Sequence, residues 1–98
     1  MQFARNVQFH VKSGKDKEFA SLLEKEIVPT LRKQGGFKEN FTLVNPGHAM
    51  TISIWNDRQS AETYNTSTYP TLVQKLNPVI EGTPKVETYE VATSTLRT

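Results

Sequence analysis

The chain has 98 residues, which is enough for one compact domain and too few for two, so we expect a single domain spanning residues 1–98. Twelve Lys and Arg residues against ten Asp and Glu give a net charge of +2, too slight to favour binding to nucleic acid or to a membrane surface. The absence of cysteine excludes disulfides and thiolate chemistry and suits a cytoplasmic location. No apolar run approaches a membrane span, and the first residues lack the apolar stretch of a signal peptide.

Alternation of apolar and polar residues predicts a first strand over about residues 2–12. One parity of this segment is apolar and is interrupted by Arg5. The other parity is polar and includes Asn6 and His10, whose side chains therefore share one side of the strand.

Apolar residues then recur at helical spacing over about residues 16–34. Pro29 lies inside this run, so we expect the helix to kink or restart near Val28. The pair Gly35–Gly36 is expected to end it.

The second half of the chain predicts a hairpin, two short helices and a last strand. The hairpin has strands over 37–44 and 49–55 with a turn at 45–48. Pro70 is expected to separate helices over 59–65 and 71–76. A connection rich in turn formers follows over 77–84, and the last strand covers about 86–93.

The order β-α-β-β-α-β predicts an α+β, ferredoxin-like fold. Right-handed crossovers place both helical regions on one face of a four-stranded antiparallel sheet. The opposite face would carry too many apolar residues to stay in water, and a second copy related by a two-fold axis would cover it. We therefore expect a homodimer.

Several segments resemble the dimeric α/β-barrel superfamily, in particular its antibiotic-biosynthesis-monooxygenase-like branch. They are NVQFHVK at 6–12 followed by Gly14, LRKQGGF at 31–37, and ISIWNDR at 52–58 running into AETY at 61–64. The resemblance covers essentially the whole chain. It implies a dimer whose two sheets face each other as a barrel, with a cleft between sheet and helices in each subunit. Members of this superfamily include cofactor-independent oxygenases of polyphenolic or quinone-like substrates and haem-degrading enzymes, and many others have no established activity.

The resemblance disfavours haem degradation. Asn6 matches the first-strand Asn of the haem-degrading members, and Tyr64 falls where they have a Trp. Their haem-ligating His falls at Gln74, which cannot act as an axial imidazole ligand.

The phenol-oxidising members use Asn, Trp, Tyr and Arg side chains around the substrate, which Asn6, Trp55, Tyr64 and Arg58 could supply here. His10 could accept a phenolic proton, because imidazole titrates near neutral pH. The alternatives are a polar strand face for Asn6 and His10, and core packing for the aromatic residues. The predicted catalytic residues are Asn6, His10 and Tyr64, and the predicted substrate-binding residues are Trp55, Arg58 and Tyr69.

Neither His10 nor His48 has a second ligand at metal-binding spacing, so we predict no metal and no cofactor. The function predicted from the sequence is a cofactor-independent monooxygenase acting on a small aromatic, phenol- or quinone-like substrate. The alternative is a non-catalytic homodimer of the same fold that binds a small ligand or is purely structural.

Overall fold

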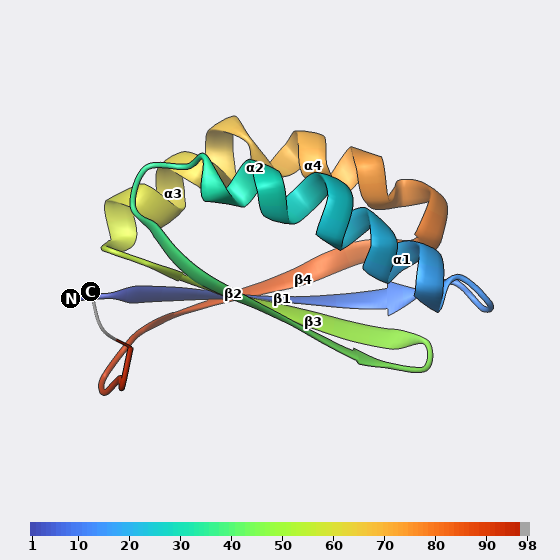
Figure 1. Cartoon of the computed structure of the whole chain (residues 1–98), viewed down its shortest axis with the longest axis horizontal. Coiled ribbons are helices and arrows are strands. Elements are labelled where there is room, and N and C mark those ends of the chain that lie inside the picture. Colours follow the sequence, from blue (N-terminus) through green and yellow to red (C-terminus); the bar gives the residue numbers. More distant parts are fainter. Residues whose placement is uncertain (97–98) are drawn as a thin grey trace.

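The computed structural model describes residues 1–96 and has the predicted α+β, ferredoxin-like architecture (Figure 1). Its four strands are β1 (Phe3–Val11), β2 (Phe37–Asn45), β3 (His48–Trp55) and β4 (Ile80–Glu90). They form one sheet in the order β2-β3-β1-β4, and every neighbouring pair is antiparallel. The strand order and the hairpin between β2 and β3 confirm the predicted fold.

The helices form a single layer on one face of this sheet (Figure 1). The first helical region consists of α1 (Asp16–Leu22), a π-helical turn (Leu23–Ile27) and α2 (Val28–Arg32). The second consists of α3 (Arg58–Ser67), α4 (Tyr69–Leu76) and a 3₁₀ turn (Asn77–Val79). None of the helices in residues 1–96 is both long enough and apolar enough to cross a membrane.

Pro29 explains the π-helical turn in the first helical region. A proline inside a helix lacks the N–H of the usual hydrogen bond, and its ring clashes with the carbonyl four residues earlier. The wider π turn ends at Ile27, and α2 begins at Val28 with Pro29 in its first turn. The prediction of a restart near Val28 is confirmed.

Two predicted boundaries were wrong. The second helical region breaks at Thr68 rather than over residues 66–70, because Pro70 lies in the first turn of α4, where its missing N–H is not needed. The last strand begins at Ile80 and ends at Glu90 rather than covering 86–93. Its early part pairs with the end of β1 through a register shift between Gln8 and His10, which accommodates turn-forming residues within an edge strand.

Alternate residues of β1 face the two sides of the sheet. Those from Phe3 to Val11 at odd positions are buried beneath the helices, where most of them join the apolar side chains of the helical layer to form the core. The core includes Phe19, whose ring packs edge-on against Phe9 at 5.2 Å between centroids. The even positions of β1 face the side that carries no helix.

A bulge in β2 changes which of its residues face the helices. Phe37 is paired with Trp55, whereas Glu39 is already paired with Ile54, so the strand gains one extra residue between them. Because side chains alternate along a strand, the bulge turns Asn40 toward the helices and Phe41 away from them.

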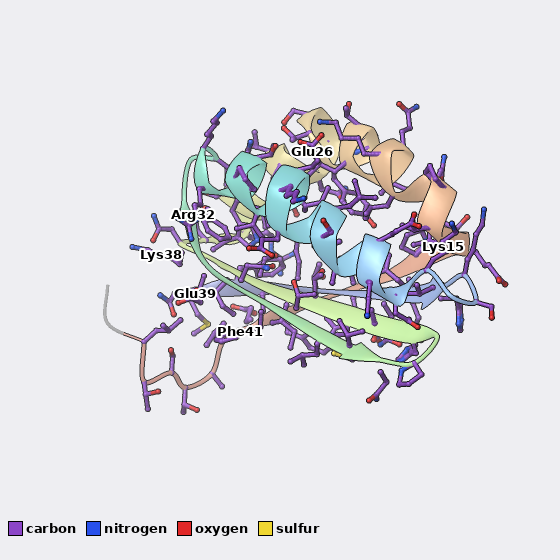
Figure 2. All side chains as sticks on the ribbon, turned by 45° about the vertical axis from the view of Figure 1, so that its right-hand side comes forward. Lys15, Glu26, Arg32, Lys38, Glu39 and Phe41 are labelled. Carbon is purple, nitrogen blue, oxygen red and sulfur yellow. The ribbon has the colours of Figure 1, made fainter. Side chains whose placement is uncertain are left out.

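The face without helices is partly apolar. Figure 2 shows Phe41 on this side of β2, and Phe41, Leu43 and Tyr89 are 51%, 52% and 52% exposed in the single chain. Met50, Ile52 and Ile54 of β3 lie between these residues in register and are only partly buried.

Candidate active site

A cavity lies between the sheet and the helical layer. Apolar side chains from both layers form most of its wall, including Val7, Phe9, Leu23, Ile27 and Leu72. Its volume is about 30 Å³, and a water molecule needs about 10–15 Å³ of such space. The cavity therefore accommodates one or two water molecules.

A row of polar residues crosses the sheet at one side of this cavity. Arg5 of β1 pairs with Ser53 of β3, and Ser53 pairs with Asn40 of β2. All three side chains line the cavity. Because neighbouring strands lie about 4.8 Å apart, Arg5 and Asn40 are separated by about 10 Å across the sheet. The row thus places a cation at one end and an amide at the other.

Arg5 is only 3% exposed and is held between aromatic rings. Its Cζ lies 4.4 Å from the centroid of the Tyr69 ring and 5.0 Å from that of Tyr64, at distances typical of cation–π contacts. Its Nη2 donates a hydrogen bond of 2.8 Å to Asn65 Oδ1. Burial lowers the pKa of Arg5 from its usual value, and the neighbouring tyrosines oppose this shift. An arginine remains charged even so.

Local sequence signals place the two tyrosines. The side chain of Asp57 accepts a hydrogen bond of 2.8 Å from the backbone N–H of Ser60 and so caps the start of α3. From this start, helical periodicity carries Tyr64 to the buried face of α3. The break at Thr68 then starts α4 with Tyr69, so both rings reach Arg5.

Burial raises the pKa of Tyr64 to about 12 and also raises the pKa of Tyr69, while the positive charge of Arg5 opposes both shifts. Both phenols are therefore protonated at neutral pH and act as hydrogen-bond donors. None of the side chains that line the cavity in residues 1–96 is a histidine or a carboxylate. The arrangement can stabilise an anion, but it contains no ordinary side-chain base.

Two buried polar atoms in this cavity have no hydrogen-bond partner among the described residues 1–96. They are the hydroxyl of Tyr69 and Oδ1 of Asn40. The amide nitrogen of Asn40 donates to Thr42 at 3.4 Å, so its oxygen is the atom left available. Unpaired buried polar atoms are uncommon in folded proteins, and in a cavity they are natural contacts for a ligand.

Of the predicted substrate-binding residues, Tyr69 lines the cavity. Trp55 is completely buried behind Tyr64, with 5.0 Å between ring centroids, and its indole N–H donates to Ser53 Oγ at 2.9 Å. Arg58 lies outside the cavity, over the ring of Phe3 at 5.1 Å, and lines a neighbouring groove between α3 and β4.

The predicted catalytic residues are divided between the two faces of the sheet. Tyr64 lines the cavity, whereas Asn6 and His10 have the opposite parity from Arg5 and face the side without helices. Asn6 donates a hydrogen bond of 3.4 Å to Met50 Sδ there. His10 is exposed beside His48, with 6.0 Å between the ring centroids. The structure therefore does not bring Asn6 and His10 together with the tyrosines.

Sequence reasoning did not identify Arg5 and Asn40 as site residues. The signal for Arg5 was present, because an arginine interrupts the otherwise apolar parity of β1. Asn40 gave no such signal, since its inward orientation results from the bulge in β2.

Within residues 1–96, no three His, Asp or Glu side chains gather closely enough to hold a metal ion.

The model of the antibiotic biosynthesis monooxygenase family matches residues 2–76. This match covers most of the chain, including β1 and the tyrosines of the cavity. The protein therefore belongs to the antibiotic biosynthesis monooxygenase family. No curated protein is similar enough in sequence to count as a relative.

Solved structures share the fold at low sequence identity. A protein of unknown function from Nitrosomonas europaea has a TM-score of 0.84 at 18% identity, covering 99% of this chain and 95% of its own. SnoaB, a cofactor-independent oxygenase from Streptomyces nogalater, has a TM-score of 0.79 at 14% identity, covering 98% of both chains. The monooxygenase ActVA-Orf6 of Streptomyces coelicolor, solved with nanaomycin D, has a TM-score of 0.78 at 16% identity, covering 98% of this chain and 92% of its own.

Proposed function

We propose that this protein is a cofactor-independent monooxygenase that oxidises a small aromatic, phenol- or quinone-like substrate in the cavity between sheet and helices. The observation that carries the proposal is the cavity itself, which joins an apolar wall to the charged and hydroxyl groups of Arg5, Tyr64 and Tyr69. Membership of the family and the similarity of fold to two oxygenases support the reaction class.

The chemistry requires an electron-rich substrate anion in a dry site. The charge of Arg5 favours ionisation of a bound phenol, because an opposite charge nearby stabilises the ionised form. The proton passes to solvent as the substrate binds, since the cavity lining supplied by residues 1–96 contains neither histidine nor carboxylate. The hydroxyls of Tyr64 and Tyr69 donate hydrogen bonds to oxygen atoms on which negative charge collects.

For a hydroquinone, the substrate supplies all of the electrons. Its anion passes an electron to molecular oxygen, and the resulting radical pair joins through a new bond between oxygen and a ring carbon. The O–O bond then breaks, one oxygen atom stays on the ring, and the other leaves as water with two hydrogens of the substrate. The product is a hydroxyquinone, and no further reductant is needed.

An aromatic ring is larger than the cavity of about 30 Å³. For the ring to enter, the part of the helical layer that contains Leu23 and Ile27 must therefore move outward from the sheet. These residues belong to the π-helical turn, and such turns are frequent at functional sites.

The proposal also includes a homodimer formed through the face of the sheet without helices. The exposed Phe41, Leu43 and Tyr89 support it, because a soluble protein rarely leaves such an apolar group in water. A two-fold axis over this face would bring the same apolar patch of two copies together, so that a residue i meeting a residue j of the other copy is matched by j meeting i.

Oxygen uptake with hydroquinone and substituted hydroquinones, measured in the presence of a metal chelator, tests the activity. We expect turnover by the unmodified protein, with a loss of about 10-fold or more for Tyr69→Phe, which removes a hydrogen bond to a charged oxygen. Tyr89→Phe is the matched control, since Tyr89 is outside the cavity and half exposed. An absence of oxygen uptake, together with a rise in melting temperature on ligand addition, would support the non-catalytic binding protein instead.

A further inference from the structure

We infer that the ligand of this cavity is an aromatic anion, bound with its charged oxygen at Arg5 and with a hydroxyl group at Asn40. This inference rests on the proposed use of the cavity and specifies the chemistry of what enters it. The negative charge can be that of a carboxylate or that of a phenolate, and the experiments below distinguish the two.

The first argument is the missing counter-charge of Arg5. The only salt bridge within residues 1–96 joins Lys15 and Glu18 on the surface. Arg5 and Glu62 both line the groove between α3 and β4, but they are not within salt-bridge distance of each other. A buried charge without a partner is destabilising. The faces of two tyrosine rings and one amide oxygen offset only part of this cost. A ligand anion would complete the pairing.

The second argument is the unused hydrogen-bonding capacity of Arg5. A guanidinium has five N–H donors in a planar fork. Nη2 of Arg5 donates to Asn65 Oδ1, and the hydroxyls of Tyr64 and Tyr69 lie near the guanidinium, so some of the five donors remain available. The unpartnered hydroxyl of Tyr69 belongs to the ring that stacks closest to this guanidinium. An anionic oxygen in the cavity can accept hydrogen bonds from both groups, and a carboxylate can accept two from the fork.

The third argument is the free acceptor at the other end of the polar row. Oδ1 of Asn40 is buried and has no partner in the part of the chain that the structure describes, so it needs a donor such as a ligand hydroxyl. The two ends of the row are about 10 Å apart between backbone positions, so a ring with polar groups at opposite ends could reach both once the helical layer has moved outward to admit it. A purely apolar ligand would leave both ends unpaired, and buried polar groups without partners oppose binding.

The test compares the binding of 4-hydroxybenzoate with that of 4-hydroxybenzamide, which has the same shape and no charge. We expect calorimetry on the unmodified protein to show about 10-fold or more tighter binding of the carboxylate. Arg5→Met should abolish this preference, and Arg32→Met, which removes an exposed arginine at the end of α2, should leave it unchanged. Equal affinity for both compounds, or a preference that survives Arg5→Met, argues against a carboxylate.

The phenolate is tested with 4-nitrophenol at pH values above and below the pKa of its hydroxyl. Binding that strengthens as the phenol ionises, in the unmodified protein and not in Arg5→Met, assigns the charge to a phenolate. If neither the carboxylate nor the phenolate is preferred over its neutral form, the inference is overturned.

The hydroxyl end is tested with Asn40→Leu. The unmodified protein should bind 4-hydroxybenzoate several-fold more tightly than benzoate, and Asn40→Leu should remove this difference. A hydroxyl preference that persists in Asn40→Leu contradicts the assigned orientation.

Measurements on the unmodified protein keep the inference testable if Arg5→Met fails to fold. ¹⁵N resonances of the Arg5 guanidinium should shift on addition of 4-hydroxybenzoate and not on addition of the benzamide. Anion binding without oxygen uptake would retain this inference and reject the oxygenase. Oxygen uptake with neutral substrates that does not depend on Arg5 would retain the oxygenase and reject this inference.

Discussion

The two faces of the sheet combine apolar and polar residues in different ways. On the covered face, apolar side chains enclose a buried cation and two tyrosines. On the other face, polar residues such as Asn6 and Gln8 are joined to neighbouring strands by hydrogen bonds, and large apolar side chains are exposed beside them. The same strand, β1, contributes to both faces. The role of a polar residue in this strand therefore depends on which face of the sheet its side chain occupies.

The largest expected difference concerns stability, and it compares two phenylalanines. Phe19→Ala should lower the free energy of unfolding by about 3–5 kcal/mol, because Phe19 is completely buried and its removal leaves a cavity. Phe41→Ala should cost far less in the isolated chain, because Phe41 is half exposed. Chemical denaturation at low protein concentration measures both, and similar losses would contradict the comparison.

The next difference concerns association. Leu43→Glu should weaken the proposed dimer by about 100-fold, since it would bury an unpaired carboxylate in the interface. Val44→Glu is the matched control, because Val44 is the next residue, is also exposed, and faces the opposite way. Sedimentation velocity over a range of concentrations measures the effect. A monomeric unmodified protein would remove the dimer from the proposal.

A third difference concerns the pH dependence of stability. The pKa of Tyr64 is raised from 10.0 to about 12 in the folded chain, so between these values the unfolded chain releases a proton that the folded chain retains. The free energy of unfolding should therefore be unaffected by this group below pH 10 and should fall by about 1.4 kcal/mol per pH unit between pH 10 and the folded-state pKa of about 12.

Tyr64→Phe should reduce this alkaline loss of stability, and Tyr89→Phe should not, because Tyr89 is half exposed on the other face. Thermal unfolding followed from pH 9 to pH 12 measures the difference. An equal effect of both variants would show that burial beneath the helices does not control the ionisation of Tyr64.

The smallest expected effect concerns His10. His10→Gln should leave the rate of oxygen uptake and its pH profile unchanged, because the exposed imidazole lies across the sheet from the cavity. If the pH profile of this variant instead lost an ionisation near neutrality, the result would support the predicted role of His10 as a base. It would also place the active site on the face of the sheet without helices.

Periodicity predicted most of the fold. The alternation in β1 and the helical spacing after Asp16 identified the first strand and helix, and the turn at 45–48 identified the hairpin. The start of β4 was missed, because Gly82 and Pro84 are typical of turns and become part of a strand only through pairing with β1.

The candidate site was predicted only in part. Tyr64 and Tyr69 were found through the apolar stripe of the second helical region, and they do line the cavity. Asn6 and His10 were grouped correctly on one side of β1, but the choice of side depends on where the helices pack.

The sequence by itself determined the order of strands and helices, because apolar periodicity and turn residues act locally along the chain. It also determined that one face of the sheet would lack helices, because right-handed crossovers place both helical regions on the same side. Only the tertiary structure decided that Arg5 would be buried between two tyrosines and in line with Asn40. That arrangement depends on strand register, on a one-residue bulge and on contacts between residues far apart in the chain, none of which is encoded in local periodicity.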